Sequence, residues 1–205
     1  MWAIVTDGSI TKILNQPKGL VIGDTRHSRK IFSLWSEAER NAIGIYEVVF
    51  DDTNKKDGEY YTNTNQSFAF ADGAVTASYG SATARAHADT LFTAQDESDG
   101  LGTEGDVKYV GLKTVKIRQI KHQASAELAN TDWYIVRKAD AGTAVPSAIT
   151  NHRAAVRTKC AEMETDITNA ADTQAIETLY TTVNTGTEEN PVYATPLGEL
   201  PMLEV

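Results

Sequence analysis

Short runs of alternating apolar and polar residues mark the first part of the chain and predict β-structure. Trp2–Val5 and Ile10–Leu14 are apolar runs on either side of Asp7-Gly8, a pair that favours the tight turn of a β-hairpin. Ser67–Tyr79 repeats this design, with aromatic residues alternating on one arm and Asp72-Gly73 at the turn. We therefore expect two hairpins, one at each end of a β-rich region.

The segment between these hairpins mixes strand and helix signals. Leu20–Ile22, Ile31–Phe32 and Ile45–Phe50 are short apolar runs that we interpret as strands. Ser36-Glu-Ala-Glu39 has the spacing of a capping box and predicts a short helix, which should end at Gly44 because glycine tolerates the left-handed conformation.

A helical period replaces the alternation later in the chain. A first stripe of apolar residues, spaced at helical intervals, precedes Thr131-Asp132, and these two residues should end or kink its helix. A second apolar stripe, with a seven-residue repeat, follows Pro146. Asp172 or Thr173 is placed to cap a third, shorter helix. The first stripe is Ile117, Ile120, Ala124 and Leu128, and the second is Ile149, Val156, Met163 and Ala170, with Cys160 and Ile167 beside it. Packing these stripes together predicts an antiparallel helical hairpin.

These patterns predict an α+β protein in four parts. We expect a β-rich domain over 1–79, a Gly- and Asp-rich linker or long loop over 80–106, a helical region over 107–185, and an extended tail over 186–205. Ala82–Phe92 within the linker is also compatible with a helix. The tail holds three of the five prolines, which favours an extended backbone.

Charge and composition narrow the classes of partner. The 205 residues carry a formal net charge of -9, so the chain gains nothing from releasing counterions at phosphate or from an anionic lipid surface. We therefore expect no nucleic-acid partner and no membrane insertion. No signal peptide is evident at Met1–Val5, and we expect synthesis in a cytoplasm.

The sequence offers little support for catalysis or for a cofactor. The four histidines are far apart, and neither a nucleophile elbow nor a phosphate-binding P-loop is present. Cys160 lies on the apolar stripe and is expected to pack rather than react. We expect a protein that is not an enzyme, although a triad assembled from distant residues would leave no local signature.

Two acidic loops have the composition, but not the spacing, of calcium sites. Asp51–Glu59 misses the EF-hand pattern by one residue and contains two lysines, and a second acidic cluster occupies Asp96–Asp106. Solvated turns explain both loops better than a bound cation, so no metal is predicted.

One order of elements resembles a known group of proteins. The expected order is a helix ending at Thr131-Asp-Trp133, a short apolar run, a polar loop with Pro146, and a helix with Arg153-Ala-Ala-Val-Arg157. This order is similar to the C-terminal region of tail-fibre assembly proteins and related tail accessory proteins of bacteriophages. Short runs of the N-terminal half, such as Ile31-Phe-Ser-Leu-Trp-Ser36, also look phage-like. Two departures exist: Tyr134–Asp140 replaces a Pro-rich stretch, and Pro196–Pro201 lacks a Trp-Pro pair.

The resemblance implies a non-enzymatic structural or accessory protein of the virion tail. Such a protein would dock on or link tail-fibre components, and we expect a homo-oligomer or a place in a symmetric assembly. One alternative is a fibre-assembly chaperone, which the two departures disfavour. Another is a carbohydrate-binding module, in which Trp2, Trp35 and Tyr60-Tyr61 would stack on sugars, although a core position is the commoner fate of such residues.

Three residues are candidates for partner binding, namely Trp133, Arg153 and Arg157. For Trp133 we favour a place in the core between two helices, with an anchor for a neighbouring subunit as the alternative. Arg153 and Arg157 lie four residues apart, and we expect a solvated face paired with acids such as Asp132 or Glu162. Solvated side chains are also expected for the basic residues of the preceding helix, Lys108, Lys113, Lys116, Arg118 and Lys121.

Overall fold

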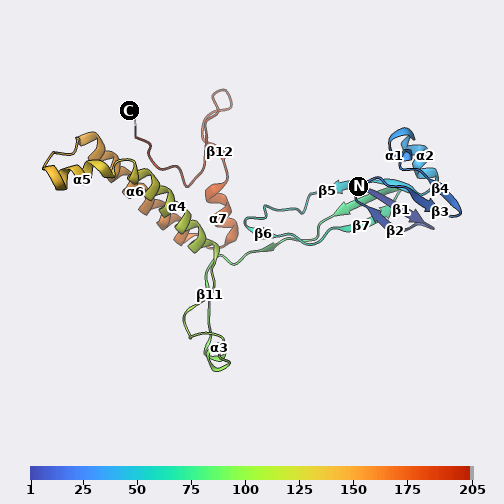
Figure 1. Cartoon of the computed structure of the whole chain (residues 1–205), viewed down its shortest axis with the longest axis horizontal. Coiled ribbons are helices and arrows are strands. Elements are labelled where there is room, and N and C mark those ends of the chain that lie inside the picture. The colour runs from blue at the N-terminus through green and yellow to red at the C-terminus, as the bar shows by residue number, and fades with distance from the viewer. Residues whose placement is uncertain (204–205) are drawn as a thin grey trace. The chain divides into compact units, whose positions relative to one another are not determined.

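A computed structural model describes residues 1–203 and divides the chain into two compact units, Met1–Thr83 and Ala84–Val205 (Figure 1). Helices make up 36% of the chain and strands 23%, with the sheet early and the helices late, so the predicted α+β class is correct. The strands are β1 (Trp2–Thr6), β2 (Ser9–Leu14), β3 (Leu20–Ile22), β4 (Thr25–His27), β5 (Ile45–Asp51), β6 (Tyr61–Thr62), β7 (Ser67–Ala71), β8 (Ala74–Ser78), β9 (Thr83–Ala84), β10 (Thr90–Leu91), β11 (Val107–Tyr109), β12 (Val183–Asn184) and β13 (Tyr193–Ala194). The helices are α1 (Ile31–Leu34), α2 (Glu37–Ala42), α3 (Ala94–Ser98), α4 (Leu112–Ala129), α5 (Asp132–Ala141), α6 (Ser147–Asn169) and α7 (Thr173–Tyr180).

The N-terminal unit is built on a curled five-stranded sheet in the order β2-β1-β5-β8-β7. Both predicted hairpins are confirmed, and each turn has its Asp and Gly at positive φ, Asp7 and Gly8 in one and Asp72 and Gly73 in the other. Strand β8 inserts between β5 and β7 and runs parallel to β5. The sheet curls far enough that its edge strands β2 and β7 contact each other.

Alternation along the strands fills two hydrophobic clusters, one on each face of the sheet. Ala3 lies in a cluster with Val48, Val75 and Ala77, whereas its neighbour Trp2 packs with the second cluster. That second cluster contains Leu14, Ile31, Phe32 and Ile45, and thus includes the apolar residues of α1. Both faces of β1 therefore pack against hydrophobic side chains.

The turn of chain at Ile31–Phe32 is helical, so the predicted strand is wrong there. Both side chains are buried, and Ile31 N–H donates to the carbonyl of Ser28 at the start of a single helical turn. A two-residue apolar run has no period, and a short helix buries it as well as a strand does. The helix predicted at Ser36 is confirmed as α2, with a complete capping box between Ser36 and Glu39.

The C-terminal unit is centred on the predicted helical pair, α4 and α6. Ile120 packs with Met163 and Ile167, while Ala124 packs with Val156 and Cys160, so positions that rise along α4 meet positions that fall along α6. This antiparallel order confirms the predicted hairpin. Helix α7 contacts both partners, and its N-terminus is capped by Asp172, whose carboxylate accepts from Ala175 N–H.

Two segments outside the helical pair have more structure than the sequence suggested. Residues 86–111 form a projection, here called the finger, in which β10 pairs with β11 and α3 occupies the tip (Figure 1). The alternative helix over Ala82–Phe92 is wrong, because this stretch contributes β9 and β10. In the tail, β13 pairs with β12, and Leu197 returns to the helical core with only 2% of its surface exposed.

No helix among the described residues is long and apolar enough to cross a membrane.

The fold predicts a strong requirement for glycine at position 44. Gly44 has φ +80°, and a Cβ there would collide with the carbonyl oxygen of Val5. The two residues are held close together because the Val5 N–H donates to the carbonyl oxygen of Gly44. We expect Gly44→Ala to lower the free energy of unfolding of the N-terminal unit by about 1–3 kcal/mol, the usual cost of backbone strain of this kind. Chemical denaturation followed by tryptophan fluorescence measures the change.

Gly58→Ala is the matched control, because a Cβ at Gly58 meets nothing within 4 Å. A Gly44→Ala variant as stable as Gly58→Ala would contradict the assigned strain.

Candidate docking surface

The joint between α4 and α5 is held by a buried arginine. Arg153, on α6, has 8% of its surface exposed and donates from one terminal nitrogen to the carbonyl oxygen of Leu128 at 2.7 Å and to Thr131 Oγ1 at 2.6 Å. Its other terminal nitrogen lies 2.8 Å from Asp132 Oδ1. The guanidinium therefore joins the last turn of α4 to the first residue of α5.

The polarity of both helix ends favours this arrangement. Leu128 belongs to the last turn of α4, where carbonyl groups lack helical partners and a cation is favourable. Asp132 belongs to the first turn of α5, where a carboxylate is favourable. A planar guanidinium is the side chain that can serve several acceptors at once from a buried position.

The prediction of a solvated face is therefore wrong for Arg153 and right for Arg157. Arg157 is exposed, one helical turn away on α6, and its guanidinium lies 3.3 Å from the backbone oxygen of Arg153. The predicted pairing of Arg153 with Asp132 is present. Sequence spacing placed both arginines on one side of α6, but it gave no sign that the acceptors at the end of α4 would bury one of them.

Trp133 is exposed, which corrects the expectation that it fills the core. Its exposed fraction is 51%, whereas Thr131, two residues earlier, is 1% exposed and occupies the joint instead. The Trp133 ring lies 3.8 Å from the ring of Tyr134, measured between centroids, and the Arg137 guanidinium lies 4.6 Å from the Trp133 ring centroid. Because α5 starts directly after Thr131, its first turn carries the indole outward.

Helix α5 has no buried residue over its whole length. Ile135 and Val136 are also exposed, so apolar side chains face solvent on more than one side of the helix. A helix this short is marginal by itself in water and is normally stabilised by packing an apolar face. The first two turns of α5 thus present an aromatic and cationic surface, Trp133, Tyr134 and Arg137, which we call the α5 face.

A groove between α4 and α6 ends at Asp132, beside the α5 face. Lys121 and Glu164 pair across it at 2.9 Å, and the side chains of Arg153 and Arg157 lie along one side. Its lining residues are Lys121, Ala124, Ser125, Leu128, Asp132, Arg153, Arg157, Cys160, Ala161 and Glu164. The structure therefore brings Arg153 and Arg157 into one groove, whereas Trp133 is not part of its lining and follows the lining residue Asp132 in the chain.

Cys160 lies in this groove as a packed thiol. Burial raises the pKa of the Cys160 thiol, and Glu164, whose Oε1 lies 3.6 Å from Sγ, raises this pKa further by its hydrogen bond and its charge. Since the thiolate is the nucleophilic form, this environment opposes the activation that a catalytic cysteine needs. The prediction of a packed side chain agrees with its place in the hydrophobic core.

Among the basic residues of the finger and α4, Lys116 also differs from expectation. It is 3% exposed, and its ammonium lies 4.1 Å from the centroid of the Tyr180 ring. A long aliphatic stem allows a lysine to cross the apolar interior between helices.

The acidic loops are organised by their own hydrogen bonds. Asp51 accepts from the backbone N–H and the hydroxyl of Thr53, and these two bonds lower the pKa of its carboxyl. Asp96 accepts from Thr93 and from Lys108 Nζ at 2.6 Å. Within residues 1–203, no group of three or more His, Cys, Asp or Glu side chains is placed to share a metal ion.

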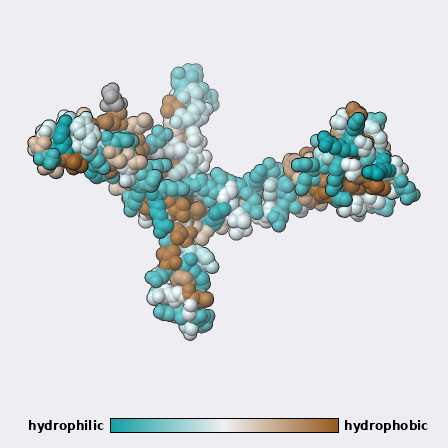
Figure 2. All heavy atoms as spheres, viewed as in Figure 1, coloured by the Kyte–Doolittle hydropathy of each residue, from teal (hydrophilic) through white to brown (hydrophobic). Residues whose placement is uncertain are grey.

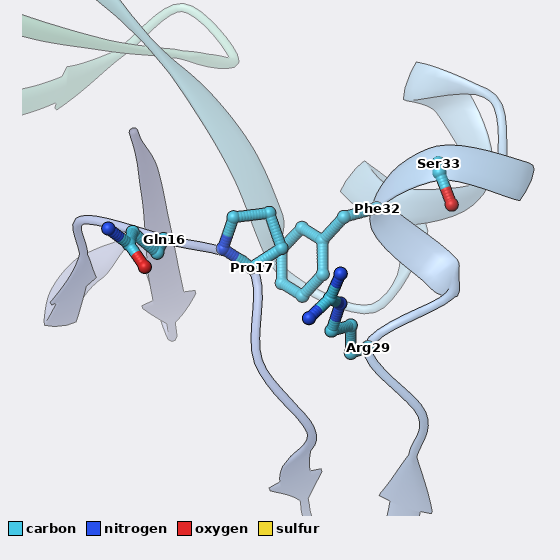
Figure 3. A pocket seen from close by; sticks show the side chains of 5 residues that line it. All are labelled: Gln16, Pro17, Arg29, Phe32 and Ser33. Atoms are coloured by element: carbon cyan, nitrogen blue, oxygen red, sulfur yellow. The ribbon is translucent and has the colours of Figure 1, made fainter.

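The N-terminal unit has a separate, small hollow beside α1 (Figure 3). Pro17 faces the Phe32 ring, with Arg29 below them and Gln16 and Ser33 at the sides. Its described lining contains neither a carboxylate pair nor a nucleophile with a base, so we assign it no reaction. Tyr60 and Tyr61, considered above for sugar stacking, are 4% and 5% exposed and lie in the core.

The joint predicts a large difference between two neighbouring arginines. We expect Arg153→Met to lower the free energy of unfolding of the C-terminal unit by about 3 kcal/mol, because Asp132, Thr131 and the carbonyl of Leu128 lose a buried ionic partner. Arg157→Met, one turn along the same helix, should change it by less than about 0.5 kcal/mol, as is usual for an exposed site. Urea denaturation followed by circular dichroism compares the two, and equal effects would show that the buried network is not what holds the joint.

The raised pKa of Cys160 predicts slow thiol chemistry in the folded protein. At pH 8 the thiolate fraction is lower than for an ordinary cysteine, so reaction with an aromatic disulfide reagent should be at least about tenfold slower than in the urea-unfolded chain. Glu164→Gln removes the negative charge, lowers the pKa and should accelerate the native reaction. Equal rates in the folded and unfolded chains at pH 8 would be inconsistent with the assigned environment.

Comparison with known proteins finds no match, whether among protein-family models, curated proteins or solved structures.

Proposed function

We propose that this protein is a non-enzymatic structural or accessory component of a bacteriophage tail, which docks on or links tail-fibre components. The observation that carries the proposal is the amount of surface that the chain leaves uncovered. The accessible surface is 13434 Å². Two separate globular domains of these lengths would expose only about 11,300 Å², so the excess is about 2,000 Å².

The excess surface includes many apolar side chains, most of them in the C-terminal unit. Exposed large hydrophobic residues occur on the finger, on α5 and on the β12–β13 hairpin. Patches of this kind on a folded domain mark surfaces that a partner covers. A standard protein–protein interface buries about 800 Å² on each partner, so an excess of about 2,000 Å² on one chain is ample for docking.

The α5 face has the composition of a binding hot spot. Tryptophan, tyrosine and arginine dominate such sites, and Trp133, Tyr134 and Arg137 are adjacent here. The cation–π contact with Arg137 holds the indole in place before a partner arrives, which reduces the ordering cost of binding. In this proposal Trp133 contacts the partner, and Arg153 is a positioning residue that fixes the start of α5.

The neighbouring groove indicates what the partner segment should carry. The lining of the groove includes the small or apolar side chains of Ala124, Leu128 and Cys160. Its other charged side chains form two ion pairs, Lys121 with Glu164 and Arg153 with Asp132, whereas the cation of Arg157 is exposed. An apolar side chain with a nearby carboxylate complements this lining. The partner therefore fits a fibre or tail segment with an acidic residue next to aliphatic ones.

The similarity of Thr131-Asp-Trp133 and Arg153–Arg157 to tail accessory proteins supports the choice of assembly. In the structure these two motifs meet in one hydrogen-bonded joint, which gives a physical reason for them to occur together. The same similarity extends to assembly chaperones, which would act during morphogenesis and then leave. The location of the protein after assembly distinguishes the two roles.

Mass spectrometry of purified particles tests the proposal. We expect a defined copy number in mature particles, and particles assembled with Trp133→Ala should contain about thirtyfold less of the protein if the indole contributes about 2 kcal/mol, as hot-spot residues do. Leu34→Ala, which alters an exposed apolar residue of the N-terminal unit outside these surfaces, should leave incorporation unchanged. Absence of the protein from mature particles would overturn the structural role in favour of a chaperone.

A further inference from the structure

The finger contains a two-stranded ribbon that leaves apolar residues uncovered. Leu91 and Val107 are cross-strand partners, and Tyr109 pairs with Thr90 on the other side of an irregularity in the strand register. Their exposed fractions are 47%, 48% and 66%, and Val110 is 44% exposed. Figure 2 shows apolar residues gathered along this projection. A two-stranded ribbon with no third layer is marginally stable in water, so this ribbon gains from being covered.

The tip of the finger is nevertheless stabilised by several side-chain contacts. Thr93 and Asp96 form a capping box at the start of α3, and Asp96 also binds Lys108 across the finger at 2.6 Å. The hydrogen bond from Lys108 and those from Thr93 lower the pKa of the Asp96 carboxyl to about 2, so this ion pair persists at neutral pH. Gly102 packs on the Phe92 ring, where a Cβ would lie 2.6 Å from ring carbons. A preorganised tip is suited to docking because little order is lost on binding.

The outer face of α4 has complementary properties. Val115, Arg118, Gln119, His122 and Gln123 line a shallow hollow on the side of α4 that faces away from α6. Val115 is exposed and Arg118 lies one turn from His122, so the hollow combines an apolar contact with a cation. The finger tip carries the opposite charge, with Glu97 and Glu104 exposed.

We propose that the finger of one copy of this chain docks on the outer face of α4 of a second copy. Pairing of two finger tips would bring like charges together, whereas a finger tip on α4 brings Glu104 near Arg118. The ribbon face with Leu91 and Val107 would then be covered beside Val115. The uncovered surface of about 2,000 Å² is enough for one such interface. Contacts between two different surfaces are heterologous and repeat from copy to copy, so they close into a ring or extend into a filament.

The experiment is the mass of the full chain in solution, measured by analytical ultracentrifugation over a range of concentrations. We expect species heavier than the 22.3 kDa chain that dissociate on dilution and at high salt. Arg118→Glu and Glu104→Lys should each weaken association at least tenfold, and the double variant Arg118→Glu/Glu104→Lys should restore it. Circular dichroism of each variant checks that it is folded.

A chain that stays monomeric at every concentration would overturn the inference. So would unchanged association of both charge variants combined with a loss in Val107→Thr, because that result assigns the contact to paired ribbon faces. Mixing the two single-charge variants is a further test. The Glu104→Lys finger fits the Arg118→Glu face, and the unaltered finger fits the unaltered face, so the mixture should recover the association that each variant alone has lost. The measurement needs no particles, so a monomeric chain that is found in particles would remove this inference and leave the proposed function standing.

Discussion

Both ends of α4 are closed by charged side chains from elsewhere in the chain, and the geometry of the C-terminal unit depends on these two contacts. At the N-terminus, Asp89 accepts from Gly111 N–H at 2.6 Å and from the Thr114 hydroxyl at 2.9 Å. At the C-terminus, Arg153 donates to Leu128 and Thr131. An anion at the first turn and a cation at the last complement the helix dipole, and they satisfy backbone groups that have no helical partner.

Each of these contacts also fixes the root of a projection. Asp89 belongs to the base of the finger, and a Cβ at Gly111 would collide with the backbone at Ala88, so the chain can approach α4 this closely only with glycine at that position. Arg153 fixes Asp132, the first residue of α5. The packed α4–α6 pair therefore acts as a rigid support, and the finger and α5 are held at its ends with little burial of their own. A rigid support that positions exposed apolar elements is the arrangement that the proposed linking role requires.

Sequence patterns predicted the supporting parts well, because those parts obey local rules. The Asp-Gly turns, the Ser36–Glu39 capping box and the stripe from Ile149 to Ala170 each depend on spacing within one element, which a single sequence displays. Ile31–Phe32 failed because two apolar residues carry no period. The finger was predicted as a linker or long loop because contacts between distant side chains, such as Asp96 with Lys108, stabilise its structure. Residue spacing does not reveal such contacts.

The candidate site shows the same limit more sharply. Trp133, Arg153 and Arg157 were the right residues to consider together, yet the expected environments of Trp133 and Arg153 were exchanged. Large aromatic residues are usually buried and arginines are usually exposed, and these tendencies decided the expectation. Here the acceptors at the joint outweigh them, because the terminal nitrogens of Arg153 bond to Thr131, to Asp132 and to the carbonyl of Leu128, 25 positions away. Once Arg153 and Thr131 fill the joint, no room is left there for an indole, and the exposure of Trp133 follows from the capping of α4.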